Sequence, residues 1–131
     1  MVTTYGRWVH VGAAWLFAGG VIIQAFLAGT ALTQLGGSGD FSAHTSFGYS
    51  VMGLLALVVL LTALIGRLPR SQVGLSVGLL LLYIVQTSLP YARDSAPLIA
   101  ALHPANAMVL LAVAIFIGWR ARRFATVPRD A

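Results

Sequence analysis

The sequence predicts an all-α integral membrane protein, a bundle of four transmembrane helices. Apolar residues make up 59% of the 131 residues and charged residues only 8%, whereas a soluble domain carries roughly 25% charged residues. The apolar residues gather into four runs, each close to the ~20 residues that cross ~30 Å of hydrocarbon. A chain of this length forms one domain, so we expect residues 1–131 to be a single transmembrane unit.

The four predicted spans cover residues 8–33, 44–66, 73–91 and 97–119. Four continuous apolar runs exclude a membrane barrel, which needs about eight or more short alternating strands. The linkers between the spans are short, so neighbouring spans should pack antiparallel. The first run exceeds the roughly 7–15 apolar residues of a signal peptide, and we interpret it as a retained span.

The charges predict an orientation in the membrane. All eight basic residues are Arg, and Arg93 alone lies on one side of the predicted spans. The other seven share the opposite side: Arg7, Arg67, Arg70, Arg120, Arg122, Arg123 and Arg129. Positive residues favour the cytoplasmic side, so we expect a bacterial cytoplasmic membrane protein with both termini in the cytoplasm. This placement accounts for the net charge of +5 without a nucleic-acid partner, and membrane lipid is the expected surrounding.

The chain contains no cysteine. Disulfides, thiolate metal sites, iron–sulfur clusters and covalently attached c-type haem are therefore excluded.

Two helix pairs carry a similar pattern, which predicts a pseudo-repeat. Gln24 in the first span is followed by His44 at the start of the second, and Gln86 in the third span is followed by His103 in the fourth. Two similar pairs in parallel order imply a pseudo-two-fold axis along the membrane normal. The second and fourth spans are then diagonal neighbours, with His44 and His103 facing each other in the outer leaflet.

Two facing histidines indicate axial ligation of one haem b, since the macrocycle needs one neutral imidazole on each side. Gly48 and Ala107 each lie four residues after a histidine, on the same helix face, and would leave room for the macrocycle. Arg93 at the outer rim could pair with a propionate.

Gln24 and Gln86 allow two interpretations. Such residues form hydrogen bonds between membrane helices, and they can also orient a histidine or approach the edge of a cofactor. The histidines likewise have alternatives: both could be interfacial and hydrogen-bonded to loops, or they could bind copper or zinc together with Asp40 or Asp94. No H-x-x-x-H or H-x-x-E spacing favours the metal-ion site.

His10 has no counterpart in the second helix pair. We expect a hydrogen-bonded histidine at the inner interface near Arg7 and Trp8, with a ligand to a partner's cofactor as the alternative. Gly74-x-x-x-Gly78 is a helix-packing pattern that serves either the bundle or a homodimer.

Three further residues near the histidines carry expectations. Met52 and Met108 lie deeper than the two histidines, and we interpret them as packing residues. Pro104 either interrupts a continuous helix or stands at the first position of one, with residues 96–102 as a short interfacial segment.

The pattern of both pairs resembles one four-helix half of haem A synthase and, more loosely, other small membrane cytochromes of the b type. The residues that carry the resemblance are Gln24, Leu27-Ala28-Gly29, His44, Gln86, His103 and Ala107. It implies one haem near the outer surface between His44 and His103. The synthase has two such halves and a membrane-embedded Glu, whereas this chain has one half and no Glu. The chain also resembles an uncharacterised bacterial family of four-helix membrane proteins.

We therefore expect a small membrane cytochrome b that transfers electrons or holds haem and is not a stand-alone enzyme. A quinol or a redox protein would exchange electrons with it. The alternative is a cofactor-free accessory subunit or a small transporter of the bacterial membrane.

Overall fold

The computed structural model describes residues 2–126, and these residues form helices and short connections without any strand. The α-helices run in the following order: α1 Val2–Ala31, α2 Ser42–Phe47, α3 Gly53–Ile65, α4 Arg70–Ser88, α5 Pro97–Ala100 and α6 Leu102–Thr126. A π-helical turn, Gly48–Met52, joins α2 to α3 without a break, and 3-10 turns follow α1 at Thr33–Leu35 and α4 at Leu89–Ala92. Arg129, one of the seven residues in the orientation argument, lies outside the described residues.

Four helical segments are long and apolar enough to cross a membrane: Thr3–Ala31, Ser42–Ile65, Arg70–Ala92 and Pro97–Thr126. The prediction of four helices able to span a membrane is therefore confirmed. Their bounds differ from the predicted ones, because α6 runs on to Thr126 and α1 begins six residues before the predicted start at Trp8. Arg7 explains the difference, because its guanidinium is bonded inside the fold. It donates to the carbonyl oxygens of Gly66 at 3.1 Å and of Phe124 at 2.9 Å.

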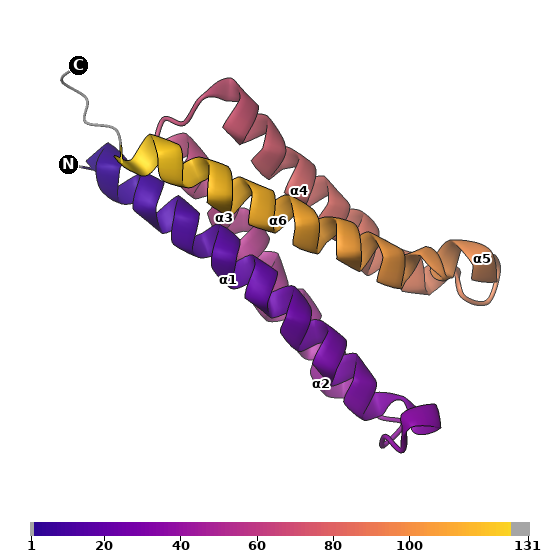
Figure 1. Ribbon diagram of the computed structural model, residues 1–131. Coiled ribbons are helices and arrows are strands. Elements are labelled where there is room, and N and C mark those ends of the chain that lie inside the picture. Colours follow the sequence, from indigo (N-terminus) through magenta and orange to yellow (C-terminus); the bar gives the residue numbers. More distant parts are fainter. Residues whose placement is uncertain (1, 127–131) are drawn as a thin grey trace.

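The helices form a ring in which α1 packs against α3 and α6, and α4 packs against the same two helices. Neighbours along the chain are antiparallel, and the α2–α3 segment lies diagonally across from α6, as the repeat predicts. The two helix pairs lie close together at the end where α1 begins and α6 ends. They spread apart toward the opposite end, which carries α2 and α5 (Figure 1).

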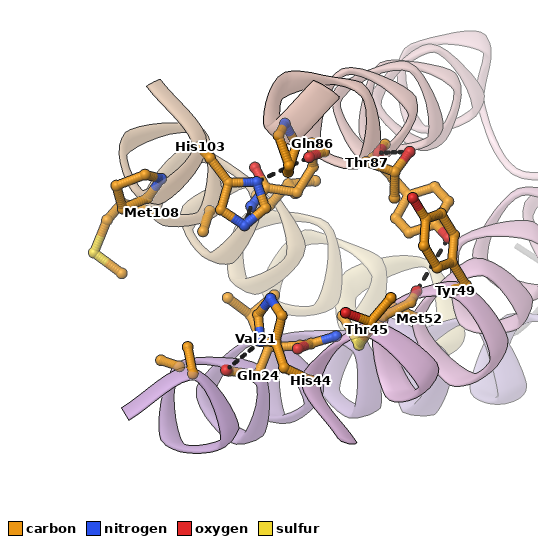
Figure 2. A pocket seen from close by; sticks show the side chains of 18 of the residues that line it. Val21, Gln24, His44, Thr45, Tyr49, Met52, Gln86, Thr87, His103 and Met108 are labelled. Carbon is orange, nitrogen blue, oxygen red and sulfur yellow. Dashed lines mark hydrogen bonds between the residues drawn. The ribbon is translucent and has the colours of Figure 1, made fainter. Parts of the chain in front are cut away.

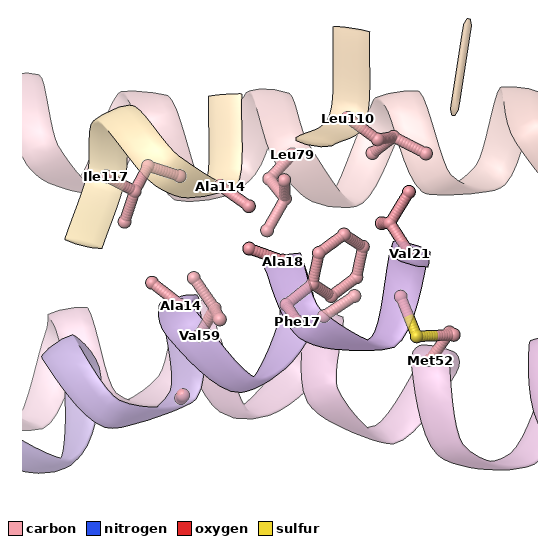
Figure 3. Packing of buried hydrophobic residues seen from close by; sticks show 12 residues of the cluster. Ala14, Phe17, Ala18, Val21, Met52, Val59, Leu79, Leu110, Ala114 and Ile117 are labelled. Atoms are coloured by element: carbon pink, nitrogen blue, oxygen red, sulfur yellow. The ribbon is translucent and has the colours of Figure 1, made fainter. Parts of the chain in front are cut away.

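The core lies at the closely packed part of the ring. Each long helix contributes a fully buried apolar side chain larger than alanine, and these four are Phe17, Val59, Leu79 and Ile117. Alanines such as Ala14 and Ala114 fill the space between them (Figure 3). Small residues allow helix backbones to approach, and close packing is what holds helices together in lipid.

His10 is not interfacial as expected, because its side chain is 0% exposed in the core. Its Nδ1–H donates to the carbonyl oxygen of Val59 at 2.9 Å, and its Nε2 accepts from Gln72 Nε2 at 3.2 Å. Gln72 also donates to the carbonyl oxygen of Ile117 at 3.0 Å. This buried polar cluster joins all four long helices, and the expected hydrogen-bonded role of His10 is thereby confirmed.

Gln72 itself was expected in the linker 67–72, and this expectation is wrong. It lies in the first turn of α4 and is fully buried. Polar neighbours in the sequence predict a linker, but inside the bundle the amide nitrogen of Gln72 donates to two acceptors, His10 and Ile117.

The two other open questions of helix packing have answers within residues 2–126. A Cβ atom added at Gly74 or Gly78 would meet nothing within 4 Å, so these glycines do not pack inside the bundle. Pro104 is the third residue of α6, and the short helix α5 precedes it. The interpretation that places Pro104 at the start of a helix is therefore closer to the structure than an interrupted helix. A residue in the first turn needs no backbone donor, so proline is tolerated there.

Candidate haem site

A cavity of about 660 Å³ lies at the spread end of the bundle. All seven residues that the sequence singled out line it: Gln24, His44, Gly48, Gln86, Arg93, His103 and Ala107. Pockets that enclose small molecules have volumes of roughly 300–1,000 Å³. The cavity therefore has the size of a ligand site, and its walls come from both helix pairs.

His44 on α2 and His103 on α6 face each other across this cavity (Figure 2). Their ring centroids are 6.1 Å apart, and the ring planes are inclined at 66°. Two imidazoles that bind opposite sides of one metal, each at about 2 Å, have ring centres roughly 6 Å apart. The spacing of the two rings thus suits a shared metal centre.

Both histidines are oriented by the same kind of hydrogen bond. His44 Nδ1 lies 3.0 Å from the carbonyl oxygen of Gln24, and His103 Nδ1 lies 2.9 Å from that of Gln86. A carbonyl oxygen only accepts, so each Nδ1 carries the proton and each Nε2 keeps its lone pair. Histidines that bind metals have this arrangement, with the second nitrogen donating to a carbonyl or a carboxylate. In both repeats, therefore, the backbone carbonyl oxygen of the glutamine fixes the tautomer of the histidine.

A π-helical turn, Gly48–Met52, begins four residues after His44. The hydroxyl group of Tyr83 on α4 donates to the carbonyl oxygen of Gly48, the first residue of this turn, at 3.1 Å. A Cβ atom at Gly53 would come within 2.7 Å of the Tyr83 hydroxyl oxygen, so a glycine is needed for Tyr83 to reach the turn. Such π-helical turns are frequent at functional sites, and the sequence analysis did not predict this one.

The space beside the histidines depends on small residues. Ala107 is partly buried and packs against the core cluster. A Cβ atom at Gly48 would lie 2.7 Å from Gln24 Nε2, so the side-chain amide of Gln24 occupies the room that this glycine leaves. Gln24 Oε1 is buried and has no hydrogen-bond partner within the described part of the chain.

Gln86 does more than its counterpart Gln24. Its Nε2 lies 3.2 Å from His103 Nε2, and its Oε1 accepts from Asn106 Nδ2 at 2.7 Å. Asn106 was missed by the sequence analysis, although its position three residues after His103 places both side chains on one helix face. The amide groups of Gln86 and Asn106 form a polar patch beside His103.

The rim of the cavity is polar. Arg93 pairs with Asp94 at 3.6 Å, and its side chain is 79% exposed, which leaves it able to turn toward a ligand. Tyr49 and Tyr91 share a hydrogen bond of 2.8 Å between their hydroxyl groups. This bond joins the two helix pairs at the cavity edge.

The remaining candidates do not supply metal ligands. No group of three or more His, Asp, Glu or Cys side chains that could hold a metal ion occurs in residues 2–126. The copper or zinc alternative therefore has no support. Asp40 instead accepts from the amide and the hydroxyl of Ser42 at the start of α2, and these two bonds lower its pKa below the usual value.

The two methionines lie at different depths of the cavity wall. Met52 is 4% exposed and belongs to the core cluster, whereas Met108 is 57% exposed and lines the cavity. The core position of Met52 agrees with the packing role expected for it.

The fold and the cavity define a four-helix membrane protein with two histidines on opposite walls of one ligand-sized cavity. The chain belongs to a family of unknown function, DUF6220, whose model matches residues 24–92. The match includes Gln24, His44 and Gln86, and His103 lies beyond it. No curated protein and no solved structure matches the chain.

Proposed function

We propose that this protein is a small membrane cytochrome b that holds one haem between His44 and His103. The observation that carries the proposal is that both imidazoles have the same tautomer and the same kind of hydrogen-bond partner. Each donates its Nδ1 proton to a glutamine carbonyl oxygen, at 3.0 Å and 2.9 Å, and keeps the Nε2 lone pair. The ring centroids are 6.1 Å apart in a cavity of about 660 Å³.

The other residues of the cavity have roles that suit this ligand. The carbonyl oxygens of Gln24 and Gln86 hold the imidazoles in the tautomer that binds a metal. Ala107 keeps the cavity wide beside them, and Gly48 leaves room for the side-chain amide of Gln24 in the wall. The exposed guanidinium of Arg93 can form a forked pair with a propionate carboxylate.

A haem held by two imidazoles supplies a one-electron redox centre without an open position for oxygen. The proposed activity is therefore electron transfer or haem holding, with a quinol or a redox protein as the exchange partner. We place the site in the outer leaflet, because the seven Arg residues of the orientation argument favour the other side of the membrane.

The absorption spectrum of the purified protein tests this proposal. Protein from haem-sufficient cells should give a reduced-minus-oxidised spectrum of a low-spin haem with two histidine ligands. His44→Ala and His103→Ala should each lose this signature. Met108→Leu is the matched control, since Met108 also lines the cavity and the exchange conserves volume.

Two results would contradict the proposal. One is a colourless wild-type preparation, which would favour the cofactor-free accessory subunit or transporter. The other is a spectrum that persists in both histidine variants. Circular dichroism of each variant verifies that the helices are retained, so that loss of the spectrum reports ligation and not unfolding.

A further inference from the structure

The two facing histidines differ in what contacts their Nε2 atoms. His44 Nε2 makes no hydrogen bond within the described residues, whereas His103 Nε2 lies 3.2 Å from Gln86 Nε2. Because His103 Nδ1 carries its proton, His103 Nε2 accepts and the Gln86 amide donates. One imidazole is thus open to the cavity, and the other is capped.

The orientation of the Gln86 amide follows from its neighbours. Asn106 Nδ2 lies 3.0 Å from the carbonyl oxygen of Leu82, which only accepts, so this atom is a donor. The Gln86 atom 2.7 Å from Asn106 Nδ2 must then be the acceptor Oε1. The amide nitrogen of Gln86 is left facing His103.

From these contacts we infer that the Gln86 side-chain amide competes with a metal for His103 Nε2, an inference that rests on the proposed haem site. We call the bond between Gln86 Nε2 and His103 Nε2 the latch. The Gln86 amide occupies the lone pair of His103 while the site is empty and must release it when a metal binds. Asn106 holds the Gln86 side chain in this orientation through its hydrogen bond to Oε1. Gln86 is therefore a positioning residue that acts through His103, and it lowers the affinity of the site.

Two other glutamines of the chain help to interpret this latch. Gln72 makes the same amide-to-Nε2 bond to His10, also at 3.2 Å, but that pair is fully buried in the core. The Gln86–His103 pair is only partly buried and borders the cavity. The same bond thus locks helices in one place and competes with a ligand in the other.

Gln24 is the control that the chain itself offers. It occupies the matching place in the first helix pair, and its backbone carbonyl orients His44 at 3.0 Å. Its side-chain amide packs beside Gly48. Replacing the amide of Gln24 changes the cavity wall without uncapping an imidazole.

Histidine ring ¹⁵N NMR of the ligand-free protein in detergent tests the capping bond directly. The two variants are Gln86→Met and Gln24→Met. Methionine keeps the length of the side chain, and the backbone carbonyl oxygen that orients the histidine is unchanged. Gln86→Met should shift the Nε2 signal of His103 to that of a free lone pair and leave the Nε2 signal of His44 in place. Gln24→Met should not move the His103 signal.

Haemin titration of the same three proteins tests the competition. Losing one hydrogen bond between membrane helices corresponds to about threefold to tenfold in affinity. Gln86→Met should therefore bind haemin about threefold to tenfold more tightly than the wild type, with a larger low-spin fraction. Gln24→Met alters the cavity wall but uncaps no imidazole, so it should bind haemin no more tightly than the wild type.

The outcomes separate the latch from the haem site. An unchanged His103 signal in Gln86→Met overturns the latch, even if all three proteins bind haemin. A shifted signal with equal or weaker haemin binding also overturns it, because the amide then does not compete. If neither the wild type nor Gln86→Met binds haemin, the proposed function and the competition both fail, and a shifted His103 signal then supports only a structural capping bond.

Discussion

The hydroxyl group of Tyr83 donates to the carbonyl oxygen of Gly48 at 3.1 Å, and this bond connects α4 to the π-helical turn that begins four residues after His44. The turn belongs to the first helix pair and Tyr83 to the second. The bond therefore fixes the backbone next to one candidate ligand from the helix pair that carries the other. It links the geometry of the two histidines although they are far apart in the sequence.

We expect Tyr83→Phe to lower the stability of the bundle by about 0.6 kcal/mol, the average for a hydrogen bond between membrane helices. The variant should also lose bound haem faster, since the turn after His44 is less firmly held. Thermal unfolding in detergent and the rate of haem loss measure the two effects. Tyr5→Phe, at a tyrosine that is 69% exposed near the other end of α1, is the control. Equal haem loss in both variants would argue against a role of Tyr83 in the site.

Ala107→Leu should reduce haem binding without removing a ligand, because the larger side chain fills space in the cavity wall. We expect the haem content per protein to fall severalfold while the helix content is unchanged. Ala112→Leu, at an exposed position on the same helix, is the matched control. Full haem content in Ala107→Leu would mean that the macrocycle does not lie against this wall.

His10→Ala and Gln72→Ala should both destabilise the bundle, because each leaves a buried polar group without its partner. Such a loss costs about 1–3 kcal/mol. Denaturant unfolding of the detergent-solubilised protein measures it, with Val77→Ala, at an exposed apolar side chain on α4, as the control. The folded fraction of His10→Ala should retain the haem spectrum. Loss of the spectrum there, with retention in His44→Ala, would assign the ligand to α1.

The predicted orientation places both termini in the cytoplasm. A reporter that is active only in the cytoplasm should give a signal when fused after Ala131, and none when inserted between Gly36 and Gly39. The reverse pattern would place the cavity and both histidines in the inner leaflet. The haem proposal would survive that result, but the direction of electron transfer would change.

Most of the helical framework could be predicted from the sequence, because hydrocarbon thickness fixes the length of an apolar run. The pairing of Gln24 with His44 and of Gln86 with His103 could also be predicted, since the two helix pairs repeat the pattern. The spacing does not reveal which atom of a glutamine is used. The backbone carbonyl oxygens orient both imidazoles, and only one of the side-chain amides reaches a histidine.

The residues that the sequence analysis missed depend on contacts between distant segments. Gln72 follows two Arg residues and has the sequence context of a linker, and its burial requires acceptors from α1 and α6. The π-helical turn has no sequence signature of its own, and Tyr83 meets it from 35 residues away. Asn106 could have been found, because residues three apart on a helix are neighbours.

The cluster of His10 and Gln72 also has a consequence for how the protein is made. The donors and acceptors of this cluster come from α1, α3, α4 and α6, so no single helical hairpin satisfies them in lipid. In a nascent chain with only its first two spans inserted, His10 Nδ1 can bond to Val59, but His10 Nε2 lacks the donor that Gln72 supplies from the third span. The fourth span then supplies the Ile117 carbonyl oxygen, the second acceptor of Gln72. Truncated and finished copies of the protein therefore differ in whether these polar groups are hydrogen-bonded in lipid.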